Sequence, residues 1–471
     1  MKKIPVFLAL SFLVQSIAFP QWQVQNAKLP DTAIAGPFST IGENICWSAW
    51  TTTFTGSSPI LNGYVRTTDG GNTWKWDTIP GTRDGSMYWI EAMDANTAFV
   101  AVENYYTPNV AGIFKTTDGG GTWKKHPVAF SNSSSGPGYV HFFDSKNGVA
   151  VGEVNQNDTT ATCFEIYTTA DTGATWSRVL ASKIPSVYFK KGSVNEFLDP
   201  TSVGSCGDCV WLQSLAGLGH EPRIYRTTDM GHNWSVLDPG FINPDSGTFL
   251  DEHKLGVAYQ NEDTGFVIGF SGSSSVLKKT SDGGTTWDSV PMPLDVHEFD
   301  INYVPGTEGT YVIAGDNNFY GNGFFHGSAY TPDGGATWKK IDDGNYVFLK
   351  FVSPNVGWSS HWGSSSIYKF TGSLTAVSTS ASAPNRYSLE QNFPNPFNPS
   401  TTISYQLAGN SHVTLRVYDI LGREVATLVD ENKSAGAYQA KFDGSGCASG
   451  VYFYRLEAGL FSSVKKFVLM K

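Results

Sequence analysis

The sequence has few charged residues and few cysteines, and it lacks long apolar runs. Asp, Glu, Lys and Arg make up 16% of the 471 residues, whereas aromatic residues make up 14% and there are 50 glycines. This balance favours many short strands joined by tight turns over long surface helices, so an all-β fold is expected. Five cysteines are too few for a disulfide framework, and the odd number leaves at least one thiol free.

The longest apolar run lies at the N-terminus and is too short to span a membrane. Lys2 and Lys3 precede an apolar stretch about half as long as the roughly 20 residues that a spanning helix needs. Ser16-Ile17-Ala18 follows and fits the small-x-small rule for cleavage. Residues 1–18 are therefore predicted to be a signal peptide cut before Phe19, and the mature chain is not expected to span a membrane.

The charge and the scattered polar residues exclude several classes of function. A formal net charge of −10 makes nucleic acid a poor partner. Cys206 and Cys209 form the only close cysteine pair, and no second CxxC or nearby histidine completes a zinc set. A local disulfide is favoured over reduced thiols for this pair, and no metal or cofactor is expected. The sequence also has no phosphate-binding glycine loop, HExxH motif or GxSxG elbow.

One octapeptide, Thr-x-Asp-x-Gly-x-Thr-Trp, occurs six times. The copies span 67–74, 116–123, 169–176, 227–234, 280–287 and 331–338, and only the fourth departs, with Asn233 in place of threonine. The aspartates are separated by 49, 53, 58, 53 and 51 residues, a period that suits one four-stranded propeller blade. A β-branched or aromatic run precedes each copy and another follows it, so each copy is predicted to be a hairpin turn.

The residue types of the octapeptide suit a self-contained turn. An aspartate can accept hydrogen bonds from its own turn, glycine supplies positive φ, and the tryptophan can bury its ring between blades. Identical acids repeated around a ring cannot converge on one substrate, which favours a structural role over catalysis or calcium binding. The predicted structural aspartates are Asp69, Asp118, Asp171, Asp229, Asp282 and Asp333.

These octapeptides resemble the Asp-box, or bacterial neuraminidase repeat. The resemblance covers residues 19 to 373, and the form of the repeats is most similar to propellers that resemble photosystem II assembly and stability factors; sialidases and xyloglucan-active glycosidases also carry the box. A seventh repeat without a box is visible at 347–370 and stops one strand short. Residues 21–24 resemble the strand that follows each box, so we predict a seven-bladed β-propeller closed by this N-terminal strand pairing with residues 366–370.

A second module follows a linker predicted at 374–386. Residues 387–471 offer alternating strands at 401–407, 413–418, 438–442, 451–456 and 464–469, enough for a small immunoglobulin-like β-sandwich. Residues 391–403, 417–425, 449–456 and 465–471 resemble the type A C-terminal sorting domain of the type IX secretion system of Bacteroidetes. The resemblance implies export to the cell surface or the medium, with the secretion machinery as partner of residues 387–471.

Two functions of the propeller remain open. A sialidase-type hydrolase needs an arginine cluster and a Phe/Tyr-Arg-Ile-Pro segment; the segment is absent, and Pro222-Arg223-Ile224-Tyr225 is only a weak echo of it. Glu262 and Asp263 could be nominated as a carboxylate pair, but neighbours on a loop are usually solvated. A binding, scaffold or adhesion role is therefore favoured, with glycoside hydrolysis as the alternative and no catalytic residue assigned.

The ligand is expected on the face opposite the octapeptides, where loops join the second and third strands of each blade. These loops vary in length and composition, as expected for binding segments on a rigid scaffold. Their aromatic side chains suit stacking on sugars or anchoring a partner protein, although they could equally plug the channel or cover neighbouring blades. The candidates for binding an extracellular glycan or surface protein are Tyr105, Tyr106, Phe319, Tyr320, Phe325, His326 and Trp362.

Overall fold

The structure is a computed structural model, and it describes residues 21–470 with gaps. The gaps are 53–58, 104–109, 127–129, 131–135, 155–159, 191–192, 195, 217–220, 242–255, 272–273, 293–299, 316–326, 362–363, 375–386, 410, 434–435 and 460. The chain divides into two compact units, Met1–Ala376 and Val377–Lys471. The expected signal peptide, residues 1–18, lies outside the described residues.

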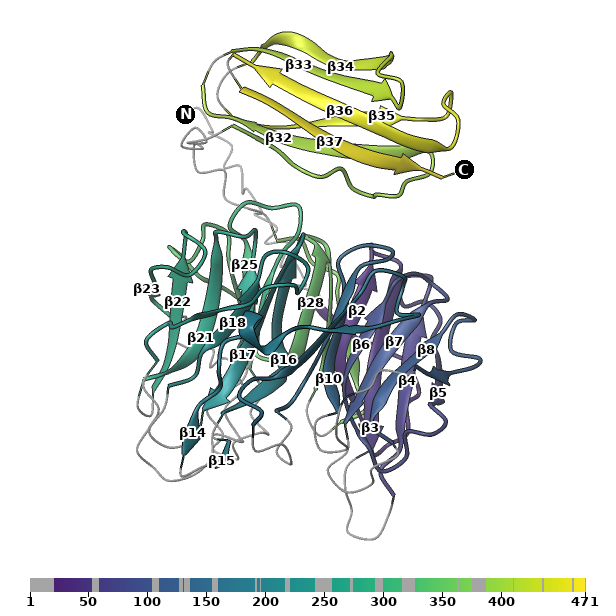
Figure 1. Cartoon of the computed structure of the whole chain (residues 1–471), viewed down its shortest axis with the longest axis vertical. Coiled ribbons are helices and arrows are strands. Elements are labelled where there is room, and N and C mark those ends of the chain that lie inside the picture. Colours follow the sequence, from purple (N-terminus) through teal and green to yellow (C-terminus); the bar gives the residue numbers. More distant parts are fainter. Residues whose placement is uncertain are drawn as a thin grey trace, which may run out of the picture. The chain divides into compact units, whose positions relative to one another are not determined.

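The described part of the first unit is built from seven four-stranded antiparallel sheets, here called blades 1 to 7 (Figure 1). Blade 1 comprises β2 (Ala33–Ile41), β3 (Ile45–Thr52), β4 (Asn62–Thr67) and β5 (Lys75–Thr78); blade 2, β6 (Ser86–Ala92), β7 (Ala98–Glu103), β8 (Gly112–Thr116) and β9 (Lys124–Lys125); and blade 3, β10 (Pro137–Phe142), β11 (Gly148–Gly152), β12 (Glu165–Thr169) and β13 (Ser177–Arg178). Blade 4 comprises β16 (Glu196–Cys206), β17 (Cys209–Ala216), β18 (Ile224–Thr227) and β19 (Ser235–Leu237).

The remaining blades follow in the same order. Blade 5 comprises β20 (Val257–Tyr259), β21 (Gly265–Ser271), β22 (Ser274–Thr280) and β23 (Asp288–Val290); blade 6, β24 (Asp300–Tyr303), β25 (Tyr311–Gly315), β26 (Gly327–Thr331) and β27 (Lys339–Asp342); and blade 7, β28 (Val347–Ser353), β29 (Val356–Ser360), β30 (Ile367–Phe370) and β1 (Trp22–Gln25). A short 3₁₀ helix, η1 (Ala181–Lys183), and a small pair, β14 (Phe189–Lys190) and β15 (Ser193–Val194), precede blade 4. First strands of successive blades contact one another around the ring, including β28 with β2. The first unit is thus a β-propeller, as predicted.

Blade 7 is completed by the N-terminal strand, which confirms the predicted closure. β1 pairs antiparallel with β30, with Trp22 opposite Phe370 and Val24 opposite Tyr368. Trp22 is 3% exposed, and its Nε1 donates a hydrogen bond to Ser328 Oγ of blade 6 at 3.1 Å. Leu374, the first residue of the predicted linker, is also buried in this region.

The six octapeptides form the turns between the third and fourth strands of blades 1 to 6. In the first, the backbone N–H and hydroxyl of Thr73 donate to the two Asp69 carboxylate oxygens at 2.9 and 2.6 Å, and the Thr67 hydroxyl also donates to Asp69. These bonds hold the pKa of Asp69 down at about 2, with the Thr73 hydroxyl as the largest cause. In the fourth copy, the Asn233 side chain replaces the threonine hydroxyl and donates to Asp229 at 2.6 Å.

The glycine at the fifth position of each octapeptide lies against the preceding blade. At Gly120, φ is +89° and a Cβ would lie 2.1 Å from the Tyr64 ring of blade 1. The octapeptide tryptophans pack in the same direction, since the rings of Trp123 and Tyr64 are 5.7 Å apart and those of Trp74 and Trp358 are 5.4 Å apart. The octapeptide therefore joins blades as well as strands.

A lysine or arginine on the third strand of several blades adds to these contacts between neighbouring blades. Lys369 of blade 7 lies 5.3 Å from the Trp358 ring centre, and its Nζ donates to the Gly70 carbonyl of blade 1 at 2.6 Å. Lys115, Arg226 and Lys279 each make the same pair of contacts with a second-strand ring and the octapeptide of the next blade. The arrangement fastens one blade to the next, including blade 7 to blade 1.

The second unit, taken by itself, is a two-sheet β-sandwich. One sheet has the order β31 (Ser388–Leu389), β32 (Ser400–Leu407) and β35 (Gly436–Asp443); the other has β34 (Glu424–Lys433), β33 (Ser411–Asp419), β36 (Gly450–Ala458) and β37 (Phe461–Leu469). Inward-facing residues such as Tyr405, Leu415, Tyr454 and Phe467 form its core. The five predicted strands are present. β34 was missed because it is an edge strand with a mostly exposed, charged sequence.

The structure has no disulfide between Cys206 and Cys209, so the favoured disulfide is not present in the part of the chain that is described. The two residues lie opposite each other at the hairpin between β16 and β17. Cys206 Sγ instead donates to the Gln260 carbonyl of blade 5 at 3.6 Å, and Cys209 is buried with a pKa raised by burial to about 11. Each thiol is thus satisfied by packing against blade 5.

Candidate functional site: the loop face of the propeller

The octapeptides occupy one face of the propeller together with the turns between first and second strands. In every box-bearing blade a backbone N–H of the octapeptide donates to a carbonyl of that turn, as Gly70 does to Asn44 at 2.9 Å and Gly334 to Gly309 at 2.8 Å. The connections between second and third strands leave from the opposite ends of these strands. That opposite side, called here the loop face, is where ligand binding was predicted.

The predicted ligand residues belong by sequence to three of these connections. Tyr105 and Tyr106 lie between β7 and β8, Trp362 lies between β29 and β30, and the remaining four lie between β25 and β26. Tyr105, Tyr106, Phe319, Tyr320, Phe325, His326 and Trp362 all lie outside the described residues. The described residues therefore define the base of the loop face, from which these connections leave.

Two buried glutamates occupy equivalent places at that base. Glu103 ends the second strand of blade 2, and Glu153 follows the second strand of blade 3. Both side chains are more than nine-tenths buried, with exposed fractions of 7% and 6%. Sequence analysis missed them, although aligning the second strands, Phe99-Val100-Ala101-Val102-Glu103 with Val149-Ala150-Val151-Gly152-Glu153, shows the correspondence.

Glu153 is only partly satisfied by hydrogen bonds. Its Oε1 accepts the backbone N–H of Leu198 in blade 4 at 2.9 Å, while its Oε2 has no hydrogen-bond partner among the described residues. Burial raises the pKa of Glu153 well above its usual value, and the charges of Glu103 and Glu196 raise it further. A buried carboxyl in this position favours its protonated form.

Glu196, at the start of blade 4, is fully enclosed by partners. It forms an ion pair with Arg223 and accepts hydrogen bonds from Ser214 Oγ at 2.6 Å and Tyr225 Oη at 3.1 Å. The Arg223 guanidinium also lies 3.8 Å from the Tyr188 ring centre. Since Glu196 is 0% and Tyr225 1% exposed, this Arg–Tyr–Glu group stabilises blade 4 from within.

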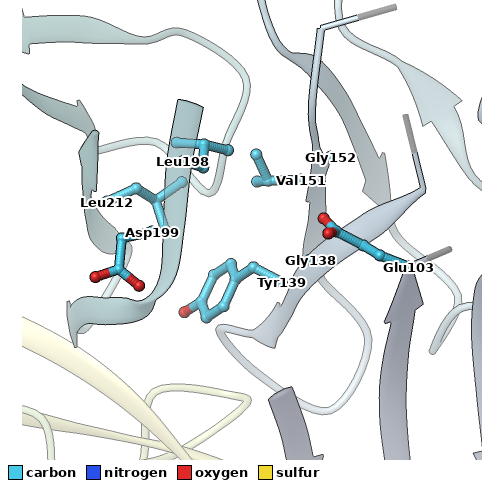
Figure 2. A pocket seen from close by; sticks show the side chains of 8 residues that line it. All are labelled: Glu103, Gly138, Tyr139, Val151, Gly152, Leu198, Asp199 and Leu212. Atoms are coloured by element: carbon cyan, nitrogen blue, oxygen red, sulfur yellow. The ribbon is translucent and has the colours of Figure 1, made fainter. Parts of the chain in front are cut away.

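A small cavity lies between blades 3 and 4 beside these acids (Figure 2). Its lining includes Glu103, Asp199 and Tyr139, and Figure 2 shows Glu103 and Asp199 on opposite sides of it. The cavity volume of about 10 Å³ is near the lower limit for a single water molecule. In the described part of the chain, no group of three or more His, Cys, Asp or Glu residues is arranged to hold a metal ion.

The first strands of the blades carry a second set of charged groups. His141 Nδ1 of blade 3 lies 2.9 Å from Glu91 Oε1 of blade 2. Lys350 of blade 7 is half-buried; burial lowers its pKa, whereas Glu91 and Asp300 raise it. Asp300 of blade 6 accepts the backbone N–H of Leu349 at 2.7 Å, so these groups tie neighbouring first strands together.

Comparison with known families identifies the second unit. Residues 391–470 match the family described as a secretion system C-terminal sorting domain. No curated protein sequence matches the chain significantly.

Several solved propellers resemble the chain. A structure described as YCF48 bound to D1 peptide has a TM-score of 0.51 and 16% identity over 76% of this chain and 98% of that one. YCF48 from Cyanidioschyzon merolae gives 0.48 and 15%, covering 74% and 98%. PorZ, a surface component of the type-IX secretion system of Porphyromonas gingivalis, gives 0.45 and 14%, and the match covers 92% of this chain but 59% of PorZ.

The protein is therefore a β-propeller joined to a C-terminal sorting domain, as the sequence predicted. A sorting domain of this kind directs type IX secretion to the cell surface or the extracellular space. None of the helices in the described ranges is long and apolar enough to cross a membrane.

Proposed function

We propose that the exported propeller is a binding module that holds an extracellular glycan or a surface protein on its loop face. The observation that carries the proposal is the difference between the two faces of the propeller: one holds the structural octapeptides and the other holds variable loops. The polar groups of the six octapeptides already form hydrogen bonds within their own turns, and the octapeptides also contact the neighbouring blades. The loop face instead bears connections of variable length, and the sequences of those in blades 2, 6 and 7 contain aromatic residues, a residue type that binds sugars and protein anchors.

The burial and hydrogen bonding of the glutamates and aspartates described above favour binding over glycoside hydrolysis. A glycosidase needs two carboxyl groups that both reach the substrate. Glu103, Glu153 and Glu196 are each more than nine-tenths buried, and the cavity beside them has room for about one water molecule. The six octapeptide aspartates, which we propose are structural, already accept hydrogen bonds from their own turns.

The organisation of the whole precursor forms part of the proposal. Residues 1–18 act as a signal peptide, 19–373 as the propeller, 374–386 as a linker and 387–471 as the sorting module that engages the secretion machinery. N-terminal sequencing of the exported protein tests the first boundary, and it should begin at Phe19.

The binding face is tested by removing its aromatic side chains. The purified protein is screened on a glycan array and against a surface-protein extract to obtain a ligand. Substituting Tyr106, Tyr320, Phe325 and Trp362 together by alanine should then abolish binding with little change in melting temperature. Trp76→Ala removes a 36% exposed ring from β5, the outermost strand of blade 1, and should leave binding unchanged.

Two outcomes would overturn the assignment. One is that the quadruple variant binds the ligand as well as the parent does. The other is that the variant unfolds, which would show that the rings have a packing role. Release of dye from linked oligosaccharides by the parent, lost in Glu103→Gln or Glu153→Gln, would instead identify a glycoside hydrolase.

A further inference from the structure

Exposed apolar side chains are concentrated in the sorting module. Eleven large apolar residues are exposed across the described chain, and seven of them lie in the second unit. The two most exposed are Leu421 at 74% and Ile420 at 73%. They are neighbours in the turn between β33 and β34.

This turn is held rigidly by backbone and side-chain bonds. Asp419 Oδ1 accepts the backbone N–H groups of Leu421 and Arg423 at 2.9 and 3.0 Å, and its carbonyl accepts that of Gly422 at 2.9 Å. Arg423 Nε and Nη2 both lie 2.7 Å from Asp419 Oδ2. The turn therefore pairs its own charges and presents Ile420 and Leu421 in a fixed conformation.

Apolar residues, some exposed and some half-buried, continue onto the outer side of the four-stranded sheet at the same end. The register places Tyr418 opposite Phe453 and Val451 opposite Val468, while Val425 is the second residue of the edge strand β34, next to the turn. Alternate residues of these strands fill the core, so these side chains face outward. Val425 and Val451 are each 39% exposed.

Together these residues make one apolar end of the sandwich. We call it the apolar end: Tyr418, Ile420, Leu421, Val425, Val451, Phe453 and Val468. Contiguous apolar patches are uncommon on soluble proteins and mark interaction sites. The core is complete without Ile420 and Leu421, so folding of the sandwich does not account for their exposure.

We infer that the apolar end is the surface by which the sorting module docks on a component of the secretion machinery, through an apolar patch on that component. This inference rests on the export role of residues 391–470. Because Asp419 and Arg423 pair with each other within the turn, the expected fit rests on apolar burial and shape at Ile420 and Leu421. A preformed turn also avoids the entropy loss of ordering a flexible one.

The test is secretion of the full chain in a bacterium with type IX secretion, scored as the fraction outside the cell against the fraction retained in the periplasm. Ile420→Ser/Leu421→Ser should reduce the secreted fraction at least tenfold. The swap Ile420→Leu/Leu421→Ile keeps the apolar character and should be secreted at parental levels. Val464→Ser removes a 55% exposed side chain four residues before Val468 on β37 and should also be secreted.

Further measurements separate docking from folding and from export itself. The double serine variant should keep the parental melting temperature because both side chains are about three-quarters exposed. Parental secretion of this variant, or equal retention of Val464→Ser, would overturn the inference. A parent that is dimeric and becomes monomeric in the variant, with secretion intact, would assign the surface to self-association. Secretion of a chain lacking 387–471 would instead refute the export role.

Discussion

The closure of blade 7 by β1 makes the propeller depend on one N-terminal tryptophan. Trp22 is 3% exposed, and its ring centre lies 5.0 Å from that of Tyr346, 5.7 Å from Phe351 and 5.3 Å from Phe370. Replacing a buried tryptophan by alanine costs about 3–5 kcal/mol. The lost hydrogen bond to Ser328 adds about 1 kcal/mol, and Ser328 keeps its bond to Asp342.

Trp22→Ala should therefore lower the free energy of unfolding by about 4–6 kcal/mol. Urea unfolding followed by tryptophan fluorescence measures this on the full chain, since all 14 tryptophans precede residue 374 and the signal reports the propeller alone. Val24→Ala, on the same strand but 65% exposed, is the control and should change stability by less than about 0.5 kcal/mol. A loss below about 1 kcal/mol in Trp22→Ala, or equal losses in both variants, would show that strand pairing alone closes the ring.

Two further predictions concern a buried acid and a crowded glycine. The folded-state pKa of Glu153 is raised, so its ionisation opposes folding and stability falls, by up to about 1.4 kcal/mol per pH unit, as pH rises from the unfolded pKa towards the folded one. Glu153→Gln should remove this slope and stabilise the protein more at pH 8 than at pH 5, as thermal unfolding at both pH values would reveal; equal changes at both would contradict the assignment. Gly120→Ala should cost about 1–3 kcal/mol beyond Gly42→Ala, since both have positive φ but only Gly120 would clash with a neighbouring ring. Chemical denaturation of the two variants compares the costs, and similar losses would attribute the effect to backbone conformation alone.

The propeller could be predicted from the sequence because each octapeptide forms its hydrogen bonds within its own segment. Asp69, Thr67 and Thr73 close the turn through bonds within one segment, so the pattern alone identifies the structure. β34 escaped prediction because its stability comes from pairing with β33 and its alternation is weak.

The candidate site was less predictable, since its geometry depends on contacts between blades. The raised pKa of Glu153 comes first from its burial between blades, and the charges of Glu103 in blade 2 and Glu196 in blade 4 raise it further. The Cys206 thiol likewise finds its partner on the next blade, which no spacing of cysteines in the sequence reveals. The seven predicted ligand residues lie beyond the described residues, and their role stays a prediction.

The pairing of β1 with β30 also bears on how the chain matures. During synthesis, β1 is made before the other strands of the propeller. It stays unpaired until almost the whole propeller has been synthesised, because its partner residues 367–370 are the last strand of the propeller. Exposed strand edges invite association with other chains, and contacts between distant segments form slowly. Ring closure thus acts as a test of completeness: a polypeptide that ends before residue 367 cannot bury Trp22 against Phe370 and keeps two open edges, which quality-control proteases and chaperones can recognise.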